Sequence, residues 1–346
     1  MDLNRRAKRV GLTAIAFALL LRLYDAGVFR WAAEQLTAPD TAAFLLFLET
    51  GRREREAEGF DFSFLPESAA PAFAAQTLPE TDSESAPETE PPTSSERDAV
   101  SVYYACSLRP DLDKLLSLPL TLDLSGEAPT VLILHTHTTE SYTKAGEDYV
   151  EVSDYRTLDE NYNMLSIGAE VAMRLEAGGV TAIQDRSLHD YPSYNGSYSD
   201  ARKSIRKYLA EYPTIRLVLD LHRDAADTPS GQLRTLASTG AGDCAQLMLV
   251  MGSSASGRKH PDWEQNLSLA LKLQAVLERN DPGITRSTVL RAQRFNQDLS
   301  PGCLLVEVGA AGNTHAEALR AADALAEGIL ALAAENSPLE PGKNVV

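Results

Sequence analysis

Two histidines and a glutamate follow one apolar segment at a spacing that suits metal binding. The segment "VLIL" at residues 131–134 leads into His135 and His137, and Glu140 comes three residues after His137. Ionisable side chains at the end of a buried strand cost several kcal/mol unless a partner compensates them. We therefore predict a metal ion held by His137 and Glu140. His135 is either an alternate ligand or a residue that orients one.

Two further apolar segments carry an ionisable residue near their carboxyl ends. His222 ends "IRLVLDLH", and Glu307 lies inside "CLLVEVG". A hydrolytic zinc site needs three protein ligands, an open position for water and a carboxylate that manages the proton. The sequence predicts that His137, Glu140 and His222 bind Zn²⁺ and that Glu307 is the catalytic acid/base.

The elements that must position these residues alternate along the chain. Apolar strands are expected at 130–135, 180–184, 215–222, 244–252 and 303–309, and amphipathic helices at 163–179, 199–213, 263–280 and 315–335. This order predicts an α/β fold, a three-layer sandwich with a mostly parallel central sheet. Because such sheets bind ligands beyond the carboxyl ends of their strands, the three segments should converge there.

The N-terminal region has the pattern of a membrane segment. Basic residues at positions 5–9 precede an apolar run at 10–21. A spanning helix prefers roughly 20 residues, and the stretch to residue 31 reaches that length. We expect an uncleaved anchor at 1–31 rather than a cleaved signal, with its N-terminal tip in the cytoplasm and the rest of the chain outside, in a single-pass cell-membrane protein.

Composition divides the remaining chain. We expect a juxtamembrane segment at 32–65, a disordered acidic linker rich in Pro, Ser and Thr at 66–98, a catalytic domain at 99–337 and a flexible tail at 338–346. The formal net charge of -17 argues against a nucleic-acid binder. Three widely spaced cysteines exclude a disulfide framework.

Several motifs, taken together and in order, resemble one known family. They are "VLILHTHTTESY", "HDYPSYNGSYSDAR", "VLDLHRDA", "HPDWEQNLSLA", "RFNQDLSPG" and "LLVEVGAAGNTHAEA". This set resembles the stage II sporulation protein P family, the engulfment-stage cell-wall hydrolases of endospore-forming bacteria. The resemblance covers roughly residues 95–335.

The resemblance implies a zinc-dependent N-acetylmuramoyl-L-alanine amidase that acts on peptidoglycan, with a fold similar to other cell-wall amidases. Peptide-cleaving activity is also attributed to the family. It further implies a membrane complex for engulfment that contains stage II sporulation protein D, a glycan-cleaving partner.

The resemblance also places individual residues. It assigns the histidine pair with Glu140, and the histidine of "LHRD", to the metal, and the glutamate of "VEVG" to acid/base catalysis. It implies a substrate groove lined by Asn195, Tyr198, Asn296 and Gln297. Glu264 of "WEQNL" is an additional candidate, with an exposed position in a first helical turn as the alternative. Other wall amidases take their zinc glutamate from the start of the first helix, so Glu160 competes with Glu140.

Two alternative functions remain open on sequence grounds. A zinc carboxypeptidase that trims stem peptides would use the same ligand spacing and an arginine for the free carboxylate, either Arg223 or Arg294. Arg223 is accordingly counted among the substrate-binding candidates. The third possibility is a non-catalytic module that holds peptidoglycan for a partner.

Overall fold

The computed structural model describes residues 94–144, 149–153, 155–228 and 231–336. The helices are α4 (Ser94–Ala99), α5 (Leu112–Ser117), α6 (Met164–Ala177), α7 (Ser197–Glu211), α8 (Trp263–Asn280), the short 3₁₀ helix η1 (Gln297–Leu299) and α9 (His315–Asn336). The central strands are β1 (Val102–Ala105), β2 (Val131–Leu134), β5 (Ala182–Gln184), β6 (Leu217–Asp224), β11 (Leu247–Met251), β12 (Thr288–Arg291) and β13 (Cys303–Ala310). Three small hairpins pair β3 (Glu151–Ser153) with β4 (Arg156–Thr157), β7 (Asp227–Thr228) with β8 (Gly231–Gln232), and β9 (Leu236–Thr239) with β10 (Gly242–Ala245).

The seven central strands form one sheet in the order β1-β12-β11-β13-β6-β2-β5. Every neighbouring pair is parallel except β11 and β13, which run antiparallel. The prediction of a mostly parallel sheet is therefore confirmed. The carboxyl ends of β2, β6 and β13 share one edge because these three strands are parallel neighbours.

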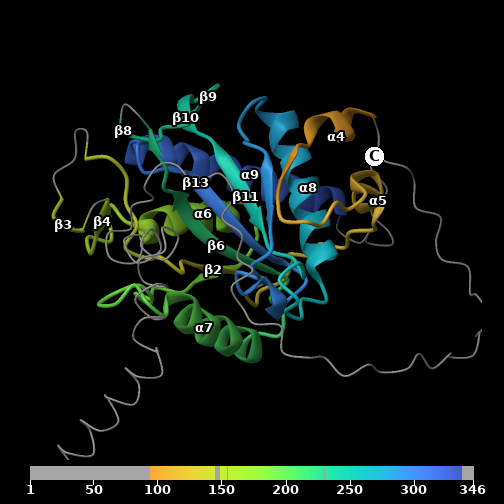
Figure 1. Ribbon diagram of the computed structural model, residues 1–346, viewed down its shortest axis with the longest axis horizontal. Coiled ribbons are helices and arrows are strands. Elements are labelled where there is room, and N and C mark those ends of the chain that lie inside the picture. The colour runs from red at the N-terminus through yellow and green to blue at the C-terminus, as the bar shows by residue number, and fades with distance from the viewer. Residues whose placement is uncertain (1–93, 145–148, 154, 229–230, 337–346) are drawn as a thin grey trace, which may run out of the picture. The chain divides into compact units, whose positions relative to one another are not determined.

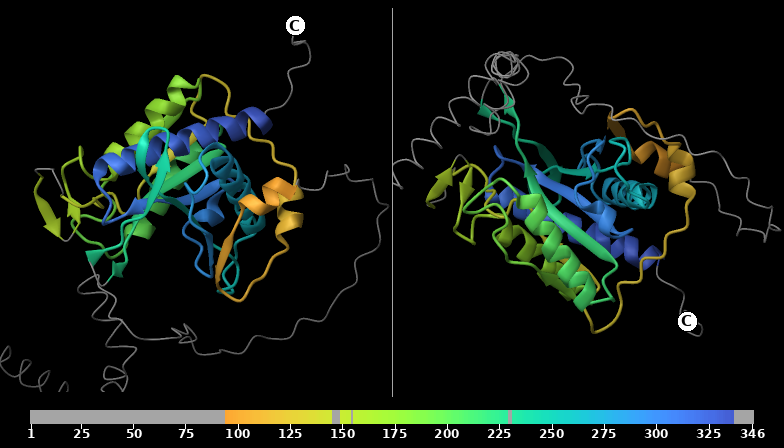
Figure 2. Two further views of the ribbon diagram at one scale, coloured as in Figure 1. Left: turned by 90° about the horizontal axis from the view of Figure 1, so that it is seen from above. Right: turned by 60° about the horizontal axis from the view of Figure 1, so that its bottom comes forward.

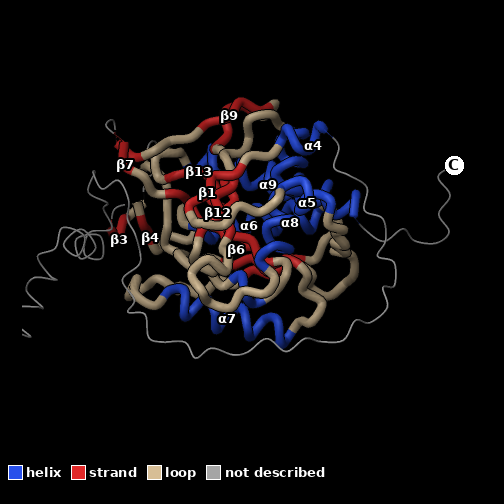
Figure 3. Tube along the Cα trace, turned by 45° about the vertical axis from the view of Figure 1, so that its right-hand side comes forward, coloured by secondary structure: helices blue, strands red, loops and turns tan. Residues whose placement is uncertain are grey.

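Helices cover both faces of the sheet and make three layers (Figure 1). Helix α7 lies on one face, where Ala201 and Ile205 pack against Leu132 and Leu134 of β2 and against Val218 of β6. The tube view in Figure 3 shows the strands between α7 and the group formed by α5, α8 and α9.

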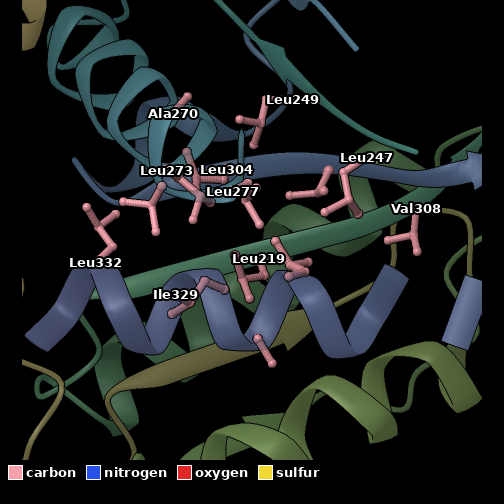
Figure 4. Packing of buried hydrophobic residues seen from close by; sticks show 14 of the residues in the cluster. Leu219, Leu247, Leu249, Ala270, Leu273, Leu277, Leu304, Val308, Ile329 and Leu332 are labelled. Atoms are coloured by element: carbon pink, nitrogen blue, oxygen red, sulfur yellow. The ribbon is translucent and has the colours of Figure 1, made fainter. Parts of the chain in front are cut away.

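The larger core fills the other face. Leu219 of β6 and Leu304 of β13 lie in it with Leu273 of α8 and Ile329 of α9 (Figure 4). Because side chains alternate along a strand, the residues next to Leu219 on β6 and next to Leu304 on β13 point to the α7 face. Alternation therefore puts His222 of β6 and Glu307 of β13 on the same face of the sheet.

The predicted elements agree with the structure in most places. The helix expected at 263–280 has those bounds, and the helix expected at 163–179 is α6, whose Asn163 side chain accepts the Leu165 N–H at 2.9 Å as an N-cap. The single strand expected at 244–252 is instead divided between β10 and β11. Strands β1 and β12 were not predicted.

The two terminal parts of the predicted organisation lie largely outside the described residues. This applies to the anchor at 1–31, the juxtamembrane segment at 32–65, the tail at 338–346 and most of the linker at 66–98. Helix α4 begins at Ser94, a few residues before the boundary expected at residue 99. Within the described ranges, no helix is both long and apolar enough to cross a membrane.

Candidate active site

The three segments that carry the predicted residues meet at one edge of the sheet. Strand β2 ends at Leu134, and the turn that follows it holds His137 and Glu140. His222 on β6 lies directly beside Glu307 on β13 in the strand register. The expected convergence at the carboxyl ends of the parallel strands is what the structure shows.

His137, Glu140 and His222 form a close, buried group. The side chains of Glu140 and His222 approach to 3.5 Å between Oε2 and Nδ1. The rings of His137 and His222 are 5.2 Å apart between centroids and stand nearly perpendicular, at 84°. Each of the three residues is less than a tenth exposed. Residues 85 positions apart in the chain are thus brought into one small volume.

Glu140 is held as a carboxylate by two arginines. Its Oε1 lies 3.3 Å from Nη2 of Arg156 and 3.7 Å from Nη1 of Arg223, and its Oε2 accepts the backbone N–H of Arg223 at 3.3 Å. Burial alone would raise the pKa of Glu140, but Arg223, His222 and Arg156 together hold it well below the usual range. Glu140 is therefore ionised at neutral pH, as a metal ligand must be.

His222 has a second carboxylate neighbour, Asp220, two residues earlier on the same strand face. Nε2 of His222 lies 3.0 Å from Oδ1 of Asp220, yet this nitrogen has no aligned hydrogen bond. Asp220 is itself fixed by Thr136, which donates to it from the backbone N–H at 2.8 Å and from the hydroxyl at 2.6 Å. Burial opposes the charged form of His222, but Asp220 and Glu140 raise its pKa well above the ordinary value.

Glu307 is the neighbour of His222 on β13. Its Oε2 is buried and has no hydrogen-bond partner, although the residue as a whole is partly accessible. Burial raises the pKa of Glu307 to about 8, and nearby His222 opposes that rise. A carboxyl with a pKa near neutrality suits a group that must both accept and release a proton.

His137 is enclosed by aromatic rings. Tyr194 stacks on it at 4.5 Å and 11°, and Tyr198 meets it edge-on at 5.6 Å and 88°. Burial lowers the pKa of His137 to about 3, so the imidazole is neutral at pH 7. A neutral imidazole is the form that binds metals.

The structure separates His135 from this group. Because β2 ends at Leu134, period-two alternation does not carry His135 to the same side as His137. Its Nδ1 lies 3.1 Å from the Leu221 carbonyl oxygen, and its Nε2 lies 3.0 Å from Nε2 of Gln184. His135 therefore lies against α6 and β5, away from the carboxylate of Glu140.

The two competing glutamates also take different positions. Glu140 lies beside His222, whereas Glu160 is exposed and forms an ion pair with Arg186. Glu264 is exposed in the first turn of α8.

The residues expected to line a groove have different surroundings. Tyr198 stacks near His222 at 6.5 Å, and Asn195 is exposed on the loop before α7. Asn296 donates to the Tyr198 carbonyl oxygen at 2.9 Å and so ties the first turn of α7 to the start of η1. Gln297 is buried and uses both ends of its amide on backbone atoms, those of Gly252 and Val250, so its side chain supports the fold instead of facing a groove.

Both arginines considered for a free substrate carboxylate already have contacts within the chain. Arg223 donates to the Ser141 and Tyr155 carbonyl oxygens at 3.0 and 2.9 Å, besides its contact with Glu140. Arg294 pairs with Asp298 at 3.1 Å. Their engagement weighs against the carboxypeptidase alternative.

Three further residues shape the site and were not predicted. Arg156 joins Glu140 to the buried Asp190, with Nη1 2.5 Å from its Oδ2. Asp220 holds the turn between β2 and His137 through Thr136. A charged residue at every second position of "LDLH" was a sequence signal for Asp220; no comparable signal marked Arg156 or Ser197, whose contact is described below.

His137, Glu140 and His222 are of residue types that bind zinc, and part of their spacing also suits a zinc ion. Among the residues that the structure describes, no group of three His, Cys, Asp or Glu side chains has the closed arrangement of a metal site. The ligand atoms of a tetrahedral zinc lie about 3.4 Å apart. Oε2 of Glu140 and Nδ1 of His222 have a similar separation, 3.5 Å. Oε2 of Glu307, on the strand beside His222, is a buried polar atom without a hydrogen-bond partner. We conclude that His137, Glu140 and His222 fit zinc as ligands.

Comparisons with known proteins bear on the family. The model of the family described as Stage II sporulation protein P matches residues 56–330. The protein of that name from Bacillus subtilis (strain 168) is 27% identical over 216 residues, which are 59% of this chain. The match spans about half of that relative, 51% of its length.

The solved structures with a similar fold are named as amidases, but their similarity to this chain is low. The N-acetylmuramoyl-L-alanine amidase AmiC2 of Nostoc punctiforme is 16% identical, with a TM-score of 0.36 over 61% of this chain and 97% of that one. The CwlD amidase from Clostridioides difficile, in complex with the GerS lipoprotein, is 15% identical, with a TM-score of 0.39 over 60% and 99%. Such values carry no weight for the activity, which depends on the site itself.

Proposed function

The chain belongs to the stage II sporulation protein P family, and we propose that it is a zinc-dependent N-acetylmuramoyl-L-alanine amidase acting on peptidoglycan during sporulation. One observation supports this proposal above the others. The buried Oε2 of Glu307 has no hydrogen-bond partner, and Glu307 lies directly beside His222 on the neighbouring strand, where His222 approaches Glu140. Buried polar atoms are rarely left unpaired unless a ligand or a reaction uses them.

The residues have distinct roles in the proposed reaction. His137, Glu140 and His222 would hold zinc, which would supply Lewis-acid activation of a water molecule and of the amide carbonyl. Glu307 accepts the proton of the attacking water and then donates it to the amine nitrogen of the stem peptide. In the metal-free chain, burial raises the pKa of Glu307 to about 8, so this carboxyl can hold a proton near neutral pH.

Arg156 and Arg223 have a supporting role. Their positive charges keep Glu140 ionised and fix the direction of its two oxygens. Thr136 and Asp220 hold the turn that carries His137 against β6. The site is thus preorganised by contacts that the chain makes by itself.

The wider setting forms part of the same proposal. The basic and apolar N-terminal pattern supports an anchor at 1–31, with the catalytic domain outside the cell membrane. Membership of the family supports a role in engulfment, a partnership with stage II sporulation protein D and an additional endopeptidase activity.

Digestion of purified peptidoglycan tests the function directly. The full-length protein in detergent should release stem peptides, lose this activity with a chelator and regain it with zinc. Mass spectrometry should find glycan strands with bare lactyl groups; trimmed stem peptides that stay attached to the glycan would instead identify a carboxypeptidase. Glu307→Gln should bind zinc but release no peptide. Unchanged peptide release by a metal-free Glu307→Ala protein would refute the mechanism.

A further inference from the structure

Ser197, the first residue of α7, contacts the ring of His137 from the side opposite to Nε2. Ser197 is 3% exposed, and its Oγ lies 3.3 Å from Nδ1 of His137. The same Oγ donates to the carbonyl oxygen of Tyr194 at 3.0 Å. The end of α7 therefore reaches the site through a hydroxyl group (Figure 2 shows α7 along its face of the sheet).

The hydrogen-bond directions follow from the number of protons. A serine hydroxyl has one proton to donate, and the shorter of its two contacts is the one to the Tyr194 carbonyl oxygen. Its oxygen is then an acceptor toward His137, so Nδ1 must carry the imidazole proton. A neutral imidazole has only one N–H, and Nε2 is left with a free lone pair.

The plane of the ring is fixed by its aromatic neighbours. Tyr194 covers one face at 4.5 Å, and the rings of Tyr198 and His222 stand nearly perpendicular to it. The Tyr194 hydroxyl lies 3.1 Å from Nε2 of His137. When Nδ1 carries the proton, Nε2 is the acceptor of this hydrogen bond, and a metal ion on Nε2 would take the place of the Tyr194 hydroxyl.

We infer that Ser197 is a positioning residue, which holds His137 as the Nδ1–H tautomer so that Nε2 is the nitrogen that binds the metal. The inference rests on the proposed function for the identity of the metal. The tautomer itself is a property of the metal-free chain. Groups that hydrogen-bond to the distal nitrogen of a ligating histidine commonly alter metal affinity about 10- to 100-fold.

Nitrogen-15 NMR of the metal-free, full-length protein tests the tautomer. Long-range imidazole correlations, assigned with a His137→Gln variant, should show the proton on Nδ1 in the wild type. Ser197→Ala should shift His137 toward the Nε2–H form. A wild-type protein with the proton on Nε2 would overturn the inference.

Competition with a chromogenic chelator then tests the consequence for zinc. Ser197→Ala should bind zinc about 10-fold more weakly than the wild type. The matched control is Ser204→Ala. Ser204 lies on the same helix as Ser197, and its Oγ is 3.0 Å from Nε2 of a different histidine, His189. This variant should leave zinc affinity unchanged. Equal zinc affinity in Ser197→Ala and the wild type would overturn the inference.

Two further measurements distinguish a wrong inference about Ser197 from misfolding of the variant and from failure of the proposed function. If Ser197→Ala does not fold, Ser197→Thr retains the hydroxyl and should keep both the tautomer and the zinc affinity; loss of the tautomer in that variant counts against the inference. If the wild type neither binds zinc nor releases peptides, the proposed function fails. A wild type that binds zinc and hydrolyses peptidoglycan with His137 as the Nε2–H tautomer refutes the role of Ser197 alone.

Discussion

Replacing Glu307 with glutamine should change the pH dependence of stability in the metal-free protein. The pKa of Glu307 is raised from 4.5 to about 8, chiefly by burial. A carboxyl with a higher pKa in the folded than in the unfolded state holds its proton more tightly when the protein is folded. Its contribution to stability is complete below pH 4.5 and is lost as the pH rises toward 8.

The size of this effect follows from the two pKa values. Between pH 5 and pH 8, the loss of this contribution lowers the free energy of unfolding of the wild type by about 3 kcal/mol, at about 1.4 kcal/mol per pH unit. Because solvent reaches part of the Glu307 side chain, this change in the free energy of unfolding is reduced, with a lower limit of about 2 kcal/mol. Glutamine does not titrate, so the variant should lack this loss.

Urea unfolding at pH 5 and pH 8 with a chelator present measures the difference. Comparing the two proteins at both pH values cancels any packing cost of the amide, because that cost does not depend on pH. Glu176→Gln, at an exposed position of α6, is the control and should retain the wild-type pH dependence. Equal pH dependence in the wild type and Glu307→Gln would show that this carboxyl is already ionised in the folded state, and it would refute the reasoning.

Two other substitutions test the supports of the site. Gly168→Ala should destabilise the protein by about 1–3 kcal/mol, because the added Cβ would lie 2.3 Å from Nε2 of Gln184 and 2.6 Å from Nε2 of His135; an unchanged urea midpoint would contradict this. Arg156→Ala should cost about 3 kcal/mol, since it leaves the fully buried carboxylate of Asp190 without its ion pair. Adding Asp190→Asn should recover part of that loss in thermal unfolding, and no recovery would count against a charge effect.

The sequence predicts the site well where an ionisable residue interrupts an apolar pattern. His222 and Glu307 stand out because buried strands otherwise hold aliphatic residues, and the parallel order of β6 and β13 then places them side by side. His137 and Glu140 stand out for the same reason at the end of β2. Their meeting follows from the adjacency of β2, β6 and β13 in the sheet. The alternation of strands and helices indicates a mostly parallel sheet, but it does not indicate the order of the strands.

Side-chain direction is hard to predict where it depends on the last residue of a strand. His135 was predicted to be either an alternate ligand or a residue that orients one, and it would share a face with His137 only if the strand continued that far. The strand ends at Leu134 and the chain turns, so the two rings diverge. One residue of strand length therefore decides whether a histidine faces α6 or the ligand group.

Strand direction is a second limit on what the pattern can give. A run such as "CAQLMLVMG" is apolar whichever way the strand runs, so nothing in it indicates that β11 lies antiparallel to β13. The four-residue strands β1 and β12 are too short for a clear period.

Residues that support the ligands are the hardest to predict, because their types are ordinary in their places. Arg156 comes from a hairpin, and a serine such as Ser197 is common at the start of a helix. Their importance comes only from tertiary contacts, with Glu140 in one case and with His137 in the other. The residues of the candidate site that are unfavourable to bury therefore stand out in the sequence, whereas the residues that support them are of ordinary types and are brought into contact only by the fold.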